Sequence, residues 1–275
     1  MTEVAVAYSP CHISGITVLY RDSSVGAGFC IEEGMTTKVS VKQTQGKVIA
    51  KFFYNNLPLE SPATSLRVVK KYAQEYGKPF EVSINHYCNL PMGYGLGISG
   101  AAAISLSYAL NYALNMNLPE KDVIKIAHNA EIEAKTGLST VIGLSMGGLV
   151  IRPKHKFRDI IRKSVNDNIY ILPIAPISTK QIISTDMWKS KVNMYGRKAM
   201  KMFMAEKTID SLIKASRYMA LETGLAELNS FFFKYISTNY DCGMAMFGFT
   251  LFSNKPIGHP RVIKTNVTDK KACLL

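Results

Sequence analysis

The sequence predicts an α+β fold. Runs typical of β-strands dominate residues 3–87, where a single helical pattern at residues 65–77 interrupts them. Beyond residue 98, long helical patterns prevail and only a few short strands lie between them. A doubly wound parallel sheet would instead require regular alternation of strand and helix along the whole chain.

The expected strands are rich in β-branched or aromatic residues and end at turn-forming residues. They cover residues 3–9, 26–43, 46–54, 79–87, 147–153, 168–175 and 243–253, with a break in the second at Glu33-Gly34. The expected helices place apolar residues three or four positions apart, and the first of them ends at Gly77. They cover residues 65–77, 98–115, 119–136, 187–205, 208–222 and 224–236.

Composition narrows the class of protein. At 275 residues and 47% hydrophobic content, the chain can bury a sizeable core as one large domain or two closely joined ones. No apolar run approaches the ~20 residues that a membrane span requires, and no basic region precedes an apolar block as in a signal peptide. The five cysteines are scattered and never form C-x-x-C. This pattern predicts reduced thiols and a cytoplasmic protein without a disulfide framework or zinc site.

The chain is strongly basic, with 33 Lys and Arg against 20 Asp and Glu, a formal net charge of +13. Such an excess suits nucleic acid, a polyanionic small substrate or simply a basic surface. The densest run, residues 152–163, is interpreted as a solvated basic turn and strand edge. Because no nucleic-acid recognition motif is present, a small anionic partner is favoured over nucleic acid.

The stretch "PMGYGLGISGAAAIS" at residues 91–105 suggests a phosphate site. Gly93, Gly95 and Gly97 remove side chains where a ligand would touch the backbone, and a helix begins directly afterwards. A Walker loop is excluded because it needs a Lys, and a dinucleotide fingerprint is disfavoured because its first glycine directly follows a strand. Close packing of a strand against a helix remains the structural alternative.

The same stretch resembles the P-x-x-x-G-L-G-S-S-A-A loop of the GHMP kinases. Six positions match, namely Pro91, Gly95, Leu96, Gly97, Ser99 and Ala101, and two depart, namely Ile98 and Gly100. The segments "YSPCHISGI", "SSVGAGFCIEEGMTTKV", "AHNAEIEAKTGLSTVIGLSMGGLVIRP" and "CGMAMFGFTLFS" are similar to motifs of archaeal pantoate kinases. The resemblance therefore spans residues 5–253.

The resemblance implies transfer of the γ-phosphoryl group of ATP to a hydroxyl of a small molecule. It also implies the GHMP kinase fold, in which residues 1–155 form a ribosomal protein S5 domain 2-like lobe and residues 156–275 an α/β-plait lobe. By motif match, Ser99 and Glu131 are expected to hold Mg2+. The expected ATP-binding residues are Pro91, Gly93, Gly95, Leu96, Gly97, Ile98, Ser99, Gly100 and Ala101.

Helical phase supports Glu131 as the inward carboxylate. Glu131 and Glu133 lie roughly 200° apart around a helix, so they cannot share a face. Glu131 shares its face with apolar Ala127, which leaves Glu133 solvated. A surface pair between Glu131 and Lys135 is the alternative.

The resemblance also assigns residues to the acceptor side. His12 and Thr140 are the expected catalytic residues, although Thr140 stands where pantoate kinases carry an Asp, and a Thr cannot accept a proton at neutral pH. His12 is expected to neutralise charge or to bind substrate, unless it is only a packed histidine at a strand end. The expected substrate-binding residues are His12, Ser14, Arg21 and Ser24.

These features predict an ATP-dependent kinase acting on a primary hydroxyl of a short anionic carboxylate. The chain also resembles the pantoate-kinase-like branch of Thermoplasma-type archaea, which implies mevalonate 3-phosphate as the acceptor, phosphorylated at its 5-hydroxyl in isoprenoid synthesis. The loss of Asp at position 140 and the basic excess favour this acceptor. The alternative acceptor is pantoate, in archaeal coenzyme A synthesis, and a more distant alternative is a non-catalytic protein that binds RNA or a protein partner. The oligomeric state stays open, with a homodimer among the alternatives.

Overall fold

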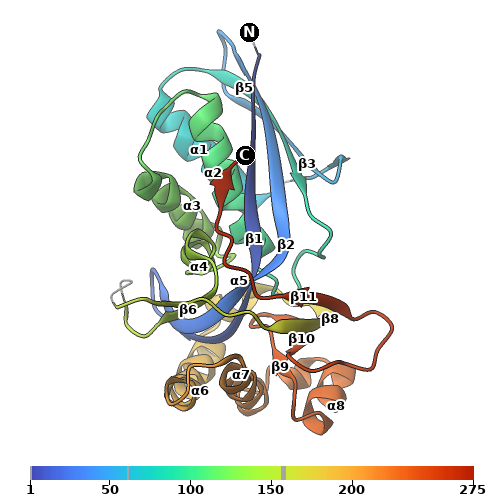
Figure 1. The fold of residues 1–275 in the computed structure, drawn as a ribbon. Coiled ribbons are helices and arrows are strands. Elements are labelled where there is room, and N and C mark those ends of the chain that lie inside the picture. The colour runs from blue at the N-terminus through green and yellow to red at the C-terminus, as the bar shows by residue number, and fades with distance from the viewer. Residues whose placement is uncertain (1, 61, 156–158) are drawn as a thin grey trace.

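The computed structural model describes residues 2–60, 62–155 and 159–275. They form two β-sheets with helices packed against them, which confirms the α+β class (Figure 1). The larger sheet has the strand order β12-β1-β2-β5-β3-β4, with β6 paired to β2 and β7 paired to β6, and the smaller sheet has the order β11-β8-β10-β9.

The strands of the larger sheet are β1 (Thr2–Leu19), β2 (Ser24–Gln43), β3 (Ile49–Tyr54), β4 (Leu57–Pro58), β5 (Phe80–Tyr87), β6 (Leu149–Arg152), β7 (Ile161–Lys163) and β12 (Cys273–Leu274). Those of the smaller sheet are β8 (Asn168–Pro176), β9 (Gly243–Met244), β10 (Gly248–Ser253) and β11 (Ile263–Asn266). The helices are α1 (Ala63–Tyr76), α2 (Ile98–Ala113), α3 (Glu120–Ala134), α4 (Thr140–Met146), α5 (Thr179–Ser184), α6 (Asp186–Met204), α7 (Ile209–Glu222) and α8 (Ser230–Thr238).

The long antiparallel pair β1–β2 runs through the molecule and carries part of the site. The sequence predicts a first strand that ends at residue 9 and a break in the second at Glu33-Gly34, but β1 continues to Leu19. The pairing shifts where Pro10 opposes Gly34 and Cys11 opposes Ile31, so the extra residues form a bulge. The bulge bends the pair without ending it.

Helices pack against both sheets, and α6 and α7 also contact β1 of the larger sheet. In Figure 1, α1, α2 and α3 lie together beside the larger sheet. Helices α6, α7 and α8 lie at the opposite end of the molecule from the N-terminus. Helix α2 contacts both β1 and α3. Its alanines at 101, 102, 103 and 109 are buried, and these small side chains allow the close approach on several sides.

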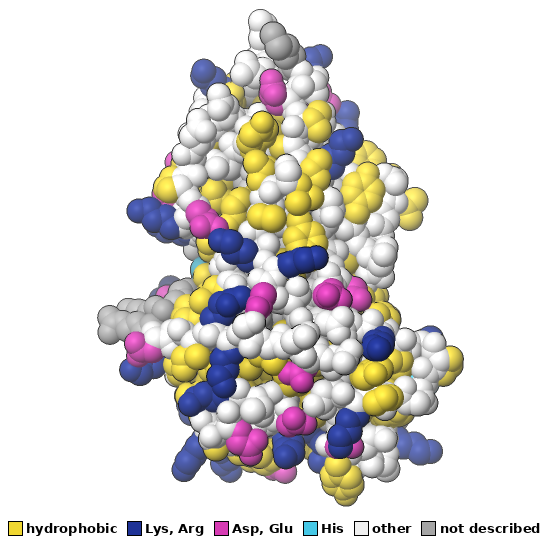
Figure 2. Space-filling model, in the orientation of Figure 1, with side chains coloured by type: hydrophobic (Ala, Val, Ile, Leu, Met, Phe, Trp, Pro, Cys, Tyr) yellow, Lys and Arg dark blue, Asp and Glu magenta, His cyan; other side chains and the backbone are white. Residues whose placement is uncertain are grey.

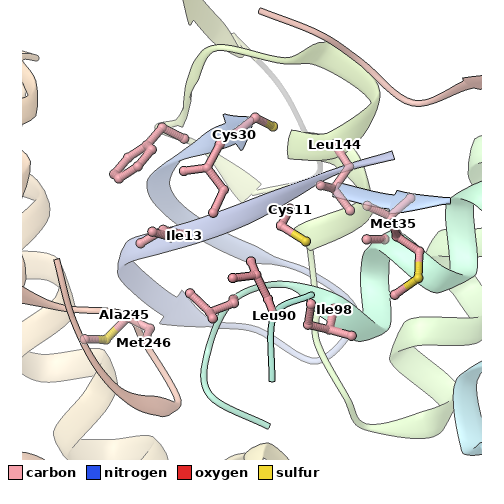
Figure 3. Close-up of a cluster of buried hydrophobic side chains, with 14 of the residues drawn as sticks. Cys11, Ile13, Cys30, Met35, Leu90, Ile98, Leu144, Ala245 and Met246 are labelled. Carbon is pink, nitrogen blue, oxygen red and sulfur yellow. The ribbon is translucent and has the colours of Figure 1, made fainter. Parts of the chain in front are cut away.

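The core continues beneath the glycine stretch. Figure 3 shows Cys11 and Ile13 of β1 gathered with Leu90, Ile98 and Leu144, all of them buried. The glycine stretch therefore begins and ends in packed residues, which fixes its position relative to β1.

Segments beyond residue 155 also complete the larger sheet. Strand β7 pairs with β6, and β12 pairs with β1 through Ala7 opposite Leu274. Residues 156–158, at the expected lobe boundary, lie outside the described residues. The division at residue 155 therefore stays a prediction, and strand pairing crosses it.

Basic side chains are spread over the surface. Figure 2 shows Lys and Arg across the visible face with Asp and Glu between them. Within the basic run, Lys154 pairs with Asp159 at 2.5 Å and Arg162 pairs with Asp269 at 2.8 Å. Local pairs of this kind suit a solvated edge for Lys154 and Arg162, but the interpretation is wrong for Arg152, the first residue of the run, which is 2% exposed. Among the helices of the described ranges, none has the length and apolar character needed to cross a bilayer.

Candidate active site

A cavity lies where the glycine stretch, α4 and the turn before β10 meet. Besides Gly93 and residues 95–100, its lining includes His12, Ser14, Thr17, Leu19, Ser24, Glu131, residues 136–140, Arg152, Thr179, Ile183, Met246 and Phe247. Residues from distant parts of the chain thus meet in one place.

The glycine loop, residues 93–97, requires glycine for two reasons. Gly93, Gly95 and Gly97 have φ of +84°, +78° and +71°, a left-handed conformation that side chains disfavour. A Cβ on Gly97 would also lie 2.9 Å from the carbonyl oxygen of His12, and one on Gly95 would lie 3.0 Å from the nitrogen of Gly248. The bare backbone therefore lies between β1 and the turn before β10.

The start of α2 suits an anion. Gly97 is the N-cap residue, and no side chain caps the helix. The first amide groups of α2 and the positive end of its dipole are thus available to a ligand in the cavity. A phosphate group fits this arrangement without any lysine.

Both sheets hold the glycine loop. The Leu96 carbonyl accepts a hydrogen bond from the amide of His12 on β1 at 3.2 Å. The Gly93 carbonyl accepts one from the amide of Ile177 at 3.0 Å, and the Tyr94 carbonyl accepts one from the Thr250 hydroxyl at 2.7 Å. These hydrogen bonds fix the backbone of the glycine loop.

Glu131 projects inward from α3, as its helical phase predicts. It is 1% exposed, whereas Glu133 is exposed and pairs with Lys71 at 2.6 Å. Burial raises the pKa of Glu131 to about 7, against the opposing effects of the Thr140 hydroxyl, the Val141 amide and the Arg152 charge. A Cβ on Gly137 would collide with Oε1 of Glu131, which explains the glycine there.

The donor set could hold Mg2+. A buried carboxylate whose pKa is raised by burial gains from a nearby cation, and Ser99 at the start of α2 adds a hydroxyl oxygen to the same cavity. In the described part of the chain, no three His, Cys, Asp or Glu side chains form a metal-binding group. Mg2+ typically takes one or two carboxylates and completes its shell with phosphate oxygens and water, so this sparse set fits.

Thr140 lies directly beside Gly100, so a side chain at position 100 would contact it. A Cβ on Gly100 would lie 3.0 Å from both Cβ and Cγ2 of Thr140 and 3.1 Å from Oε1 of Glu131. The Thr140 methyl therefore fills the space that an alanine at position 100 would need. The two departures from the family motifs compensate for each other, and the Thr140 hydroxyl acts to lower the pKa of Glu131.

Arg152, at the end of β6, is a site residue that the sequence analysis missed. It is 2% exposed, and its Nε and Nη1 have no hydrogen-bond partner. Burial lowers its pKa to about 10, so it stays charged at neutral pH. Its signals in the sequence are a charge at the end of the apolar run "GGLVIR" and its place in the segment "AHNAEIEAKTGLSTVIGLSMGGLVIRP", which is similar to a motif of archaeal pantoate kinases.

His12 is held tightly and is uncharged. A Cβ on Gly28 would lie 2.5 Å from its Cε1, and one on Gly143 would lie 2.7 Å from its Nε2. Burial, with a smaller effect from the Arg152 charge, lowers its pKa to about 3. A neutral imidazole cannot neutralise charge, so only the substrate-binding or packing roles fit this environment.

The structure brings most of the expected site residues into the cavity. The expected residues that line it are His12, Ser14, Ser24, Gly93, Gly95, Leu96, Gly97, Ile98, Ser99, Gly100, Glu131 and Thr140. Pro91, Ala101 and Arg21 do not line it. Ala101 is buried within α2, and Arg21 is exposed in the turn between β1 and β2, where it does not face the cavity.

Comparison with known proteins identifies related sequences. Residues 63–148 match the family model described as GHMP kinases N terminal domain. The chain is 33% identical to the pantoate kinase of Methanocaldococcus jannaschii over 79% of its own length and 80% of that relative. It is 30% identical to the pantoate kinase of Methanospirillum hungatei, over 90% and 86% respectively.

Solved structures share the fold. A phosphotransferase related to the CoA biosynthesis pathway aligns with a TM-score of 0.78 and 21% identity, covering 98% of both chains. The mevalonate-3-kinase of Thermoplasma acidophilum aligns with a TM-score of 0.59 and 12% identity, over 100% of this chain and 99% of that one.

The mevalonate 3-phosphate hypothesis is wrong. The relatives with high identity and coverage are pantoate kinases, from three different species, and none of these is a mevalonate kinase. The cavity gives a physical reason, because Arg152 is the one Lys or Arg among its described lining residues. A carboxylate together with a phosphate would need more cationic donors, and the excess positive charge lies elsewhere on the molecule.

Proposed function

Because this chain belongs to the GHMP kinase superfamily, and is thus an ATP-dependent kinase that phosphorylates a hydroxyl group, we propose that its acceptor is pantoate. Three relatives at 28–33% identity, each matched over 76–86% of its own length, are pantoate kinases. The observation that carries the proposal is the single buried guanidinium of Arg152 in the cavity.

Arg152 holds the acceptor by its carboxylate. A guanidinium presents donors in a planar fork that matches a carboxylate, and two of its nitrogens lack partners here. A buried charge without a partner is costly, and a substrate carboxylate would remove that cost. Pantoate carries one carboxylate and a primary hydroxyl, which suits one cation.

ATP occupies the other side of the cavity. Its phosphates would lie on the glycine loop at the start of α2, and Ser99 and Glu131 would hold Mg2+, which would neutralise phosphate charge. A neighbouring hollow shares Ile98, Ser99 and Thr136 with the cavity and is also lined by Tyr54 and Met92. This hollow is the proposed place of the nucleotide base.

The chemistry relies on positioning. The acceptor oxygen forms a bond to the γ-phosphorus while the bond from that phosphorus to the ADP oxygen breaks. Phosphoryl transfer depends mainly on alignment and charge neutralisation, so it does not require a strong base. Thr140 therefore orients Glu131 and does not act as a base, and the acceptor proton passes to solvent water.

The test is a phosphorylation assay with purified protein, ATP and Mg2+ over pantoate, mevalonate 3-phosphate, shikimate and homoserine. Pantoate should be the preferred acceptor, with the product identified by phosphorus NMR. Arg152→Gln should raise the KM for pantoate about 10- to 100-fold, since charge-assisted hydrogen bonds contribute about 1.5–3 kcal/mol, and leave the KM for ATP nearly unchanged.

Arg162→Gln is the matched control, because Arg162 lies on the neighbouring strand β7 and pairs with Asp269 away from the cavity lining. Preference for another acceptor would reject pantoate. An unchanged KM for pantoate in Arg152→Gln would reject the assigned role of Arg152.

A further inference from the structure

The turn before β10 holds a bulky residue in a conformation that favours glycine. The amide of Gly248 donates a hydrogen bond to the carbonyl of Ala245 at 3.1 Å, which closes a four-residue turn. Phe247 is the third residue of this turn and has a φ of +63°. A positive φ at the third position is typical of type II turns, where glycine or asparagine is usual. For a bulky side chain this φ is a true outlier and costs free energy.

Other left-handed residues of the chain differ from Phe247. Throughout the described ranges, the remaining non-glycine residues with positive φ are polar: Asn55, Asn56, Asn115, Asn117, Lys135, Asp159 and Lys207. Short polar side chains such as Asn and Asp tolerate this region best. An aromatic residue at such a position suggests that its ring has a use that offsets the strain.

The backbone of the turn is held firmly at the cavity. The amide of Met246 donates a hydrogen bond to the Ser14 carbonyl on β1 at 2.8 Å, and the amide of Ala245 donates one to the Thr250 carbonyl at 2.9 Å. On the other side, the backbone of Gly248 lies so close to Tyr94 of the glycine loop that a Cβ would collide with it. Because the turn cannot shift, the half-buried Phe247 is kept in the cavity lining.

The lining divides into chemically different parts. Arg152, Glu131 and Ser24 present charge or hydroxyl groups, while Phe247, Met246 and Ile183 of the same lining present apolar surface. An acceptor anchored by its carboxylate still has a carbon skeleton to place. A skeleton with two methyl groups on one carbon needs apolar contact, and polar groups cannot provide it.

We infer that Phe247 determines acceptor specificity by packing its ring against the branched carbon skeleton of the acceptor. The inference rests on the proposed function, in which pantoate supplies the two methyl groups. The strained turn is then the means by which an aromatic ring is carried at the edge of the glycine loop. The ring contributes to the choice of acceptor and not to phosphate binding.

The test compares Phe247→Gly and Phe247→Ala with the wild-type enzyme on pantoate and on 2,4-dihydroxybutanoate, which lacks the two methyl groups. Both variants should lower kcat/KM for pantoate about 10- to 100-fold, as expected for loss of contact with one or two methyl groups. The value for 2,4-dihydroxybutanoate should change little, so that the preference for the branched acceptor falls. The KM for ATP should stay the same.

Melting temperatures distinguish the backbone strain at residue 247 from the contact of the Phe247 ring with the acceptor. Phe247→Gly should melt at a higher temperature than Phe247→Ala, because only glycine adopts the positive φ freely. Lys207→Gly is the control: it relieves a φ of +56° outside the cavity lining and should leave the acceptor preference unchanged.

The outcomes distinguish the two proposals. If the wild-type enzyme does not phosphorylate pantoate, both the proposed function and this inference are wrong. A wild-type enzyme that uses pantoate, combined with equal losses on both acceptors in the Phe247 variants, overturns the inference alone and leaves Phe247 as a packing residue.

Discussion

Contacts between single residues explain why the glycine loop departs from the family motif. Gly100 has no side chain because Thr140 occupies the space beside it, and Thr140 orients Glu131 through its hydroxyl. A motif comparison treats these positions as independent, since they lie forty residues apart in the chain. The structure shows that a change at one restricts the residue at the other.

Gly100→Ala should therefore be costly in the wild type and tolerated better with Thr140→Ser, which removes Cγ2 and keeps the hydroxyl. A coupling free energy of about 1 kcal/mol is expected, typical of residues in direct contact. Urea unfolding of the two single variants and the double variant gives this value. Strictly additive effects would show that the two positions do not interact.

A second consequence at this scale concerns His86, a buried histidine that lines the neighbouring hollow proposed for the nucleotide base. Its Nδ1 lies 2.8 Å from the Thr37 hydroxyl and its Nε2 lies 3.0 Å from the Ser65 hydroxyl. Burial lowers its pKa to about 4. The unfolded chain therefore binds a proton near pH 6.5, where the folded protein does not.

The stability that His86 contributes should be complete above pH 6.5 and should be lost as the pH falls toward 4. The shift corresponds to about 3 kcal/mol. His86→Gln should be less stable at pH 7 and should lose less stability over this range, as measured by urea unfolding at several pH values. His259→Gln, outside the core, should keep the wild-type dependence, and a parallel pH profile for His86→Gln would contradict the assignment.

At the scale of elements, the two faces of α3 have different functions. Glu131 faces the cavity, and Glu133, two residues later, pairs with Lys71 at the surface. Glu131→Gln should lower kcat at least about 100-fold if the carboxylate holds Mg2+, because loss of charge neutralisation acts on the transferring phosphate. Glu133→Gln should change kcat less than about twofold, since exposed pairs contribute little.

Steady-state kinetics across a range of Mg2+ concentrations, with circular dichroism to verify folding, make this comparison. A partial recovery of Glu131→Gln at high Mg2+ would be consistent with weakened metal binding. Equal, mild effects of the two substitutions on kcat would show that Glu131 does not hold Mg2+.

The elements themselves were predicted unevenly. The long helices α2, α3, α6 and α7 and the strands β5 and β8 follow from apolar period, because each buries one face or several. The single strand predicted over residues 243–253 is wrong, because a turn at residues 245–248 divides it into β9 and β10. The sequence analysis missed α4, α5, β4, β7, β11 and β12, which are too short to establish a period. It also ended β1 too early, because Pro10 normally interrupts a strand unless a bulge accommodates it.

The site was predicted where a motif is contiguous and missed where it depends on packing. The glycine loop and Glu131 stand in local patterns whose residues face one ligand. Arg152 and Phe247 reach the cavity only through the pairing of β6 with β2 and through the turn before β10. The local sequence around Arg152 and Phe247 does not predict which elements will pack beside them.

At the scale of the whole molecule, the two halves share one site. The larger sheet takes β7 and β12 from beyond residue 155, and the glycine loop is anchored by Ile177 and Thr250. A fragment of residues 1–155 should therefore lack a cooperative thermal transition and should not bind an ATP analogue. The full chain should melt cooperatively and should bind the analogue. Cooperative melting of the fragment, followed by circular dichroism, would show that the N-terminal part is an independent domain.

The larger sheet also has a consequence for the time course of folding. Strand β1 pairs with β2, its neighbour in the chain, and also with β12, more than two hundred residues away. Chain entropy must be lost before such a distant pairing contributes any stabilising free energy. Folding rates therefore fall as contacting residues lie further apart in sequence. The hairpin of β1 and β2 can form early, but one edge of β1 stays without its partner until β12 arrives. During that interval the unpaired edge can bind to other chains, so the yield of refolded protein should fall as its concentration rises.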